Sequence, residues 1–291
     1  MKLLQNTNFV FMVSAILGLL FPQLSPVTKE FVIIALAVVM CFSLINLDFS
    51  KISRKSLPDI AINFLINYVI LTGLILILAF TLIDDEAIRL GFVVMAAVPP
   101  AIAIVPFAYL LKGDVEEALI SNTAIYLISI FLMPALMTLL TQNQTDPIRL
   151  LKVLILLILI PLAVSRYLGK FEIKHTKEIV NLCFSVVIYT VVGLNRDSFF
   201  HDPTLISVIA LICFMRTFVS GTAILMLAKS KMRIESAIVK ALFGSYKNLG
   251  FSATVALILF GERASLPSAI CILFDVLLFL YYSYILTLTR K

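Results

Sequence analysis

The sequence predicts an all-α membrane protein in which ten transmembrane helices form two inverted five-helix repeats. Hydrophobic residues make up 61% of the 291 residues, charged residues make up only 14%, and the mean hydropathy is +1.08. Apolar runs of about 20 residues, which suffice to cross a hydrocarbon core of ~30 Å, recur from end to end. Two runs are interrupted at matching places half a chain apart, a pattern typical of secondary transporters with a binding site at the membrane midplane.

The predicted spans follow one another with short connections. They cover 8–21, 29–47, 57–83, 87–111, 115–141, 149–168, 176–194, 203–229, 232–260 and 264–287. The first is short and resembles a signal peptide, but no small-x-small cleavage site follows it, so we expect it to remain in the mature protein. Because each half has an odd number of helices, the second copy must be upside down. The predicted repeats are 1–145 and 146–291.

Lysine and arginine residues between the predicted spans fall mostly on one side of the membrane. If the amino terminus is inside, the basic loops 48–56 and 165–177 are both cytoplasmic. The positive-inside rule then places both termini in the cytoplasm of a multi-pass protein of the inner membrane. The net charge of +6 reflects this asymmetry, so we expect a lipid bilayer and no nucleic acid as partner.

The fourth and ninth predicted spans are the interrupted ones. The fourth contains Pro99 and Pro100, and the ninth contains the sequence GSYKNLG at 244–250. Unwound backbone inside a bilayer is tolerated only where it lines a cavity or is buried in protein. We therefore expect two crossed, discontinuous helices that converge at the midplane. Half-helix amino ends carry partial positive charge and carboxyl ends partial negative charge, so anions and cations can both be held there.

Three ionisable residues fall near the centres of predicted spans, namely Arg216, Lys247 and Asp275. A charge at mid-membrane costs at least about 2.5–3.5 kcal/mol, so each needs a partner or a wet cavity. The simplest pairing joins Lys247 to Asp275 and leaves Arg216 near a carbonyl group or an anionic ligand. One interpretation is a static salt bridge that locks helices together. The other is a charge that responds to substrate or proton, and the place of Lys247 inside the break favours it.

Polar residues on several spans indicate a cavity beside the breaks. Asn63 and Asn67 share one helix face, and Asn122 and Thr123 are adjacent on span five. Each group could equally be interhelical hydrogen-bond glue, but their coincidence with two breaks favours a cavity. The candidate substrate-binding residues are Pro99, Pro100, Ala101, Asn122, Arg216, Ser245, Tyr246, Lys247 and Asn248, and the candidate ion-coupling residues are Lys247 and Asp275.

No enzyme motif accompanies these residues. The sequence has no HExxH, no GxSxG and no Walker loop, so we do not expect an enzyme. The four cysteines lie within predicted spans without metal or redox spacing. We therefore expect neither a metal nor a cofactor.

Four groups of short motifs occur in a fixed order along the chain. FSLINLDFS at 42–50 is similar to F-x-x-G-L-x-x-x-D-F, and VPPA at 98–101 with YLLKGD at 109–114 is similar to A-P-G-G-x-x-S-N with its Y-L-A-K-G-D tail. The segment 244–250 falls at E-x-G-x-Q-N-S-G, and LPSAI at 266–270 matches L-P-G-A-I. Over nearly its whole length the chain thus resembles the bile acid:sodium symporter family, as a bacterial-type member. The resemblance implies crossed discontinuous helices four and nine.

The chain departs from this family at the sodium sites. The family holds sodium with a Ser-Asn pair of helix four, a Ser and a Thr of helix five, and a Glu and a Gln of helix nine. The resemblance places at these positions, in the same order, Ile104, Val105, Ala118, Asn122, Phe243 and Lys247, and only the following Asn248 is kept. Such a site cannot offer a hard cation its usual oxygen shell. We infer that Lys247 replaces bound sodium electrostatically.

The leading hypothesis is a secondary transporter that moves a small, anionic organic solute by alternating access without sodium coupling. Arg216 and Lys247 would contribute positive charge, partly offset by Asp275. One alternative is a proton-coupled efflux carrier of a weak organic acid. Another is a non-transporting membrane binding or sensor protein with the same fold.

Overall fold

The computed structural model describes the chain except residues 1–3, 6, 47–50, 142–146, 172 and 289–291. The described part consists of helices, helical turns and loops, with one isolated antiparallel bridge and no strand. The predicted all-α class is therefore confirmed over these residues. The predicted repeat boundary at 145 and 146 lies outside the described residues, and so does part of the basic loop 48–56.

Seven helical runs of the described chain are long and apolar enough to cross a membrane. They are Pro22–Ser43, Arg54–Leu82, Val115–Leu140, Ile148–Leu168, Thr176–Leu194, Pro203–Lys229 and Glu262–Leu286. Two shorter apolar helices, Phe9–Leu20 and Leu249–Phe260, accompany them. The chain is thus a multi-pass membrane protein. The count of ten spans and their inverted symmetry stay predictions.

Most of the seven runs are divided into shorter helices. In chain order the helices are α1 Thr7–Leu20, α2 Ser25–Thr28, α3 Val32–Ser43, α4 Leu57–Phe64, α5 Thr72–Leu82, α6 Glu86–Ala97, α7 Ile104–Leu110, α8 Val115–Leu140, α9 Pro147–Leu154, α10 Ile160–Leu168, α11 Thr176–Leu194, α12 Arg196–His201, α13 Pro203–Phe214, α14 Ser220–Lys229, α15 Ile234–Phe243, α16 Leu249–Phe260 and α17 Glu262–Leu288. Three π-helical turns, Leu65–Leu71, Ile155–Leu159 and Met215–Val219, link α4 to α5, α9 to α10 and α13 to α14. Such turns occur frequently at functional sites.

Acidic side chains define the starts of several helices. Asp85 accepts from the Ile88 N–H to cap α6, and Asp114 accepts from the Glu117 N–H to cap α8, both at 3.0 Å. Each carboxylate satisfies an amide that has no partner within the helix, and its charge suits the positive end of the helix dipole. These polar caps mark where apolar segments begin.

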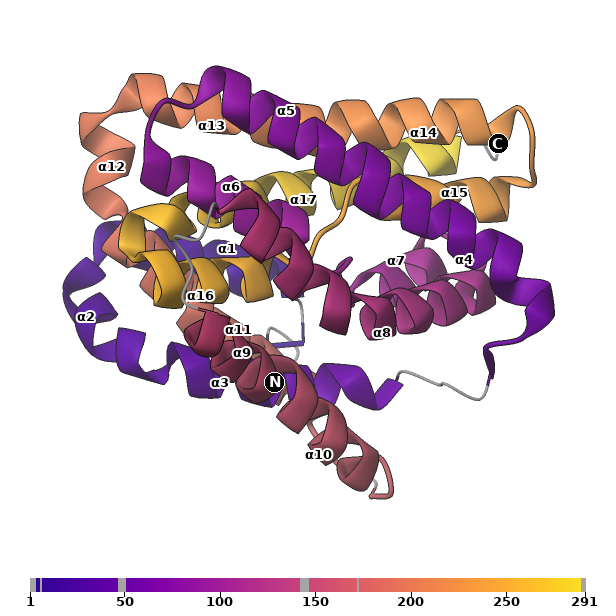
Figure 1. Cartoon of the computed structure of the whole chain (residues 1–291), viewed down its shortest axis with the longest axis horizontal. Helices are drawn as coiled ribbons and strands as arrows, with labels where there is room; N and C mark the ends of the chain where they lie inside the picture. Colours follow the sequence, from indigo (N-terminus) through magenta and orange to yellow (C-terminus); the bar gives the residue numbers. More distant parts are fainter. Residues whose placement is uncertain (1–3, 6, 47–50, 142–146, 172, 289–291) are drawn as a thin grey trace.

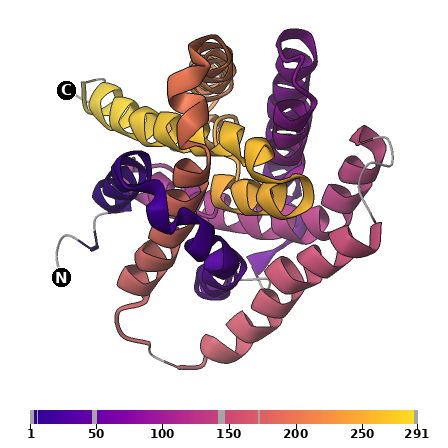
Figure 2. The same cartoon turned by 90° about the vertical axis from the view of Figure 1, so that its left-hand side faces the viewer.

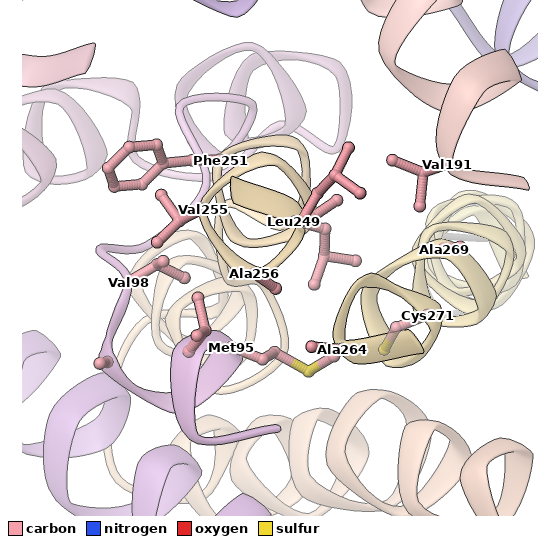
Figure 3. Close-up of a cluster of buried hydrophobic side chains, with 14 of the residues drawn as sticks. Met95, Val98, Val191, Leu249, Phe251, Val255, Ala256, Ala264, Ala269 and Cys271 are labelled. Atoms are coloured by element: carbon pink, nitrogen blue, oxygen red, sulfur yellow. The ribbon is translucent and has the colours of Figure 1, made fainter. Parts of the chain in front are cut away.

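The interrupted helices lie at the centre of the molecule. α6 packs against α5, α16 and α17, while α1 and α3 each pack against α11 (Figures 1 and 2). Met95 and Val98 gather with Val255 of α16 in the larger hydrophobic core (Figure 3). A Cβ at Gly91 of α6 would collide with the backbone carbonyl of Ala264, so glycine here lets α6 approach α17 closely.

Both predicted interruptions are confirmed. α6 ends at Ala97 and α7 begins at Ile104, whereas α15 ends at Phe243 and α16 begins at Leu249. Proline at 99 and 100 lacks backbone N–H groups and disfavours continued helix, which explains the first break. The second break follows a glycine, and the Asn248 side chain caps the helix that restarts there.

Candidate functional site at the two helix breaks

The two unwound segments lie side by side and bond to each other. The Asn248 N–H donates to the Pro99 carbonyl at 2.9 Å, and the Ala101 N–H donates to the Tyr246 carbonyl at 3.4 Å. Buried backbone groups need such partners, because leaving them unpaired in an apolar interior is costly. The antiparallel contact therefore explains why both helices can unwind at this depth.

Lys247 projects from the second break onto the end of α6. The Lys247 side chain is buried, and its Nζ donates to the carbonyls of Ala96 at 2.9 Å and Val98 at 3.1 Å. Nζ also lies 4.1 Å from the centre of the Tyr68 ring, a cation–π contact. Among the described residues no carboxylate lies within ion-pair distance of Lys247. The negative carboxyl end of the α6 dipole offsets part of its charge instead.

Asp275 pairs with Arg216. The Arg216 Nη2 donates to Asp275 Oδ1 at 3.0 Å and also to the Ser245 carbonyl just past the end of α15, while Nη1 contacts Cys271 Sγ at 3.1 Å. The predicted Lys247–Asp275 pair is therefore wrong, whereas the predicted carbonyl contact of Arg216 is confirmed. The reason is donor geometry, since a five-donor guanidinium can reach a carbonyl and a carboxylate together.

Each broken helix thus ends against a buried cation of the protein. Lys247 occupies the carboxyl end of α6, and Arg216 occupies that of α15. Two neutral donors complete the second end, with Ser220 Oγ bonding the Gly244 carbonyl and Asn67 Nδ2 the Phe243 carbonyl, both at 2.8 Å. The carbonyl clusters that could attract a small cation are therefore already occupied by side chains.

The remaining predicted site residues also lie at the breaks. Asn122 Nδ2 donates to the Ala101 carbonyl at 3.4 Å, and Tyr246 OH donates to the Asp275 carbonyl at 3.0 Å. Asn248 Nδ2 donates to Tyr126 OH at 2.7 Å. The structure gathers the predicted residues in one place, and their role in binding stays a prediction.

Comparison with known protein families gives the chain a family. A model of the SBF-like CPA transporter family matches residues 5–290. The chain belongs to this family. The SBF-like transporters are related to bile acid:sodium symporters, so the predicted family relationship is confirmed, and the chain is a secondary transporter. No curated protein matches the sequence significantly.

Two donors to the end of α6 in this SBF-like transporter were not identified from its sequence. Thr72 Oγ1 donates to the Ala96 carbonyl at 2.8 Å, and Tyr68 OH donates to the Ala97 carbonyl at 3.3 Å. Their sequence signal was weak, since hydroxyl groups are common in membrane helices.

A third buried cation of this SBF-like transporter, Lys240, was not identified from the sequence. Lys240 of α15 donates to Glu117 Oε1 at 2.6 Å and to Asp59 Oδ1 at 3.0 Å. The side chains of Lys240 and Glu117 are buried. A lysine within an otherwise apolar predicted span was the available signal, because such charges are rare without a partner.

Proposed function

We propose that this SBF-like transporter moves a small, anionic organic solute across the inner membrane by alternating access, without sodium coupling. The observation that supports this most is the occupation of both carbonyl ends at the breaks by Lys247 and Arg216. Only one carboxylate, that of Asp275, lies in ion-pair contact with these two cations among the described residues. The breaks therefore keep an excess of positive charge, which favours an anion.

Sodium independence follows from the same contacts. A hard cation takes oxygen ligands, but the carbonyls of Ala96 and Val98 already accept from an ammonium group. A sodium ion beside them would face both the loss of those ligands and repulsion from the lysine. Lys247 thus acts as a tethered replacement for the ion.

We also propose that the chain has ten spans arranged as inverted repeats, with both termini in the cytoplasm. The short α1, the seven long helical runs and the two interrupted segments would together supply ten crossings. The π-helical turns Leu65–Leu71 and Met215–Val219 precede the two breaks at corresponding places, which supports a repeat.

One observation favours proton coupling as a second candidate. Lys247 is held by carbonyls and a ring, so it can release a proton without leaving an unpaired carboxylate behind. The protein would then be an efflux carrier of a weak organic acid. A pH gradient would drive flux under this hypothesis, whereas it would have no effect on a uniporter of the anion.

The test uses the purified protein in proteoliposomes and a panel of radiolabelled organic acids. We expect uptake or exchange of at least one acid at equal rates in sodium, potassium and choline buffers. Melting curves supply a second measurement, because a ligand at 100 times its dissociation constant adds about 2.7 kcal/mol of stability. A sodium-specific melting shift would contradict sodium independence. Binding of an acid without any flux would instead support the sensor alternative.

A further inference from the structure

A pocket of about 340 Å³ lies beside the first turns of α4 and α8. Its walls include Lys51, Lys55, Asp59, Glu116, Glu117 and Ser121. Carboxylates outnumber lysines in this lining, so the pocket favours water and cationic donors over an anion. The pocket therefore suits a different species from the proposed anionic solute.

Glu117 lines the inner wall of the pocket and forms a buried ion pair with Lys240. Glu117 accepts from Lys240 at 2.6 Å, from Ser236 Oγ at 2.5 Å and from Asn63 Nδ2 at 3.1 Å. Lys240 stands one turn before the break that follows α15. The pocket thus ends close to the central site, at side chains that are buried in this structure.

Three asparagine oxygens near this wall have no hydrogen-bond partner among the described residues. They are Oδ1 of Asn63, Asn67 and Asn122, and each is fully buried. Leaving a buried acceptor without a hydrogen bond is costly, so a partner from outside the protein is expected.

Reversing the amides would not satisfy these oxygens. Asn67 Nδ2 faces the Phe243 carbonyl at 2.8 Å, and Asn122 Nδ2 faces the Ala101 carbonyl. Asn63 Nδ2 faces a carboxylate oxygen. A flipped amide would set oxygen against oxygen, because carbonyls and carboxylates only accept. All three Oδ1 atoms are therefore acceptors that await a donor.

The three acceptors connect the pocket to the breaks. Asn63 Nδ2 donates to Ser121 Oγ at 2.9 Å, and Ser121 lines the pocket. Asn122 follows Ser121 in the chain, and Asn67 lies about one turn beyond Asn63. Asn67 and Asn122 bond the two segments that meet at Tyr246 and Ala101. Polar side chains thus follow one another along α4 with the π-helical turn after it, and along α8, from the pocket toward the central site.

We propose that the pocket and the three asparagine oxygens form an access route to the breaks for water and small cationic hydrogen-bond donors. Each such species would satisfy an acceptor that the protein leaves unpaired, as buried waters do at roomy polar sites. In the present conformation the buried side chains of Ser121 and Asn63 and the Lys240–Glu117 pair lie between the pocket and the breaks.

Cysteine accessibility of the full-length protein in detergent tests the route. In a Cys41→Ser/Cys183→Ser background, Asn63→Cys and Asn122→Cys would be treated with a cationic methanethiosulfonate reagent and followed by mass spectrometry. Met133→Cys is the matched control, because Met133 is equally buried on α8 but lies beyond Asn122 on that helix. We expect both test variants to react at least about tenfold faster than the control, since a dry buried thiol reacts only after local opening.

Ala101→Cys is a further test variant in case the asparagine variants misfold, because it leaves all three asparagine side chains in place. It should also react faster than Met133→Cys if the route reaches the breaks. The proposal would be overturned if Asn63→Cys and Asn122→Cys react no faster than the control. If those two variants do not fold, the same result in Ala101→Cys would overturn it. The assay needs no transported solute, so its outcome is independent of the proposed transport function.

Discussion

Two buried cations at the breaks differ in how they are neutralised. Arg216 contacts Asp275 and the end of α15 together, so it satisfies a carboxylate and a carbonyl with one guanidinium. Among the described residues, the Lys247 ammonium group contacts carbonyls and the Tyr68 ring. Removing the Asp275 carboxylate therefore leaves Arg216 without its charged partner, whereas Lys247 depends on the carbonyls at the end of α6.

Double-mutant cycles on stability should separate these two relationships. Asp275→Asn removes the charged partner of buried Arg216, and breaking such a pair costs about 3–5 kcal/mol. Combining it with Arg216→Met should recover part of that loss, as neighbouring sites couple by about 0.5–3 kcal/mol.

The matched control is the cycle between Asp275→Asn and Lys247→Gln, which do not share an ion pair. Their effects on the free energy of unfolding should be nearly additive. Denaturant or thermal unfolding of the purified variants measures both cycles. A stronger coupling of Asp275 to Lys247 than to Arg216 would contradict the pairing described.

At the scale of elements, one ion-pair network fastens three helices. Lys240 of α15 bonds Glu117 of α8 and Asp59 of α4. The Glu117 side chain is 7% exposed and that of Asp59 is 49% exposed, so the two contacts differ in solvent screening. The ion pair of Lys240 with Glu117 is therefore the strong one, and the ion pair with Asp59 is the weak one.

Glu117→Gln should destabilise the protein far more than Asp59→Asn. Loss of the buried partner leaves Lys240 uncompensated at a cost of about 3–5 kcal/mol, whereas an exposed pair contributes under about 1 kcal/mol. Melting temperatures of the two variants in one detergent measure the difference. Equal shifts would show that Asp59 carries as much of the ion pair as Glu117.

The start of α6 provides a pH-dependent element outside the spans. Burial raises the pKa of Asp85, but hydrogen bonds from the Ile88 N–H and from Arg263 outweigh it and hold the pKa below its usual value. A depressed folded-state pKa adds stability above the unfolded-state value, and this stability is lost as the pH falls through the folded-state pKa.

Asp85→Asn should consequently melt lower than wild type at neutral pH. Asparagine keeps the cap but loses the charged hydrogen bond to Arg263, so the difference in melting temperature measures the contribution of the carboxylate's charge. The difference between the two melting temperatures should shrink as the pH falls below about 4. Melting curves from neutral pH to pH 3 test this, and a constant difference would contradict it.

At the scale of the whole molecule, the charge asymmetry predicts a fixed orientation. Lys174 and Lys231 are exposed and lie in loops predicted to be cytoplasmic, whereas exposed Asp84 lies in a loop predicted to be outside. Single cysteines at these positions should react with an impermeant thiol reagent accordingly. In intact cells we expect labelling at Asp84→Cys alone, and after permeabilisation at all three. The reverse pattern would overturn the proposed orientation.

The sequence by itself determined the class of the molecule, the two interruptions and most residues that gather there. Hydropathy and the breaks at Pro99, Pro100 and Gly244 are local properties, because each depends on backbone chemistry within a few residues. The family match rests on the same linear information. These features were therefore readable without contacts between helices.

Only the tertiary structure decided which charges meet. Lys247 and Asp275 were predicted to pair because both charges fall near the centres of predicted spans, yet Asp275 pairs with Arg216 and Lys247 donates to carbonyls at the end of α6. The contact between Lys240 and Glu117 was not predicted, because the two residues come from helices far apart in the chain. Ion pairing depends on distances between helices, and a buried cation can be balanced by a helix end that no residue type reveals.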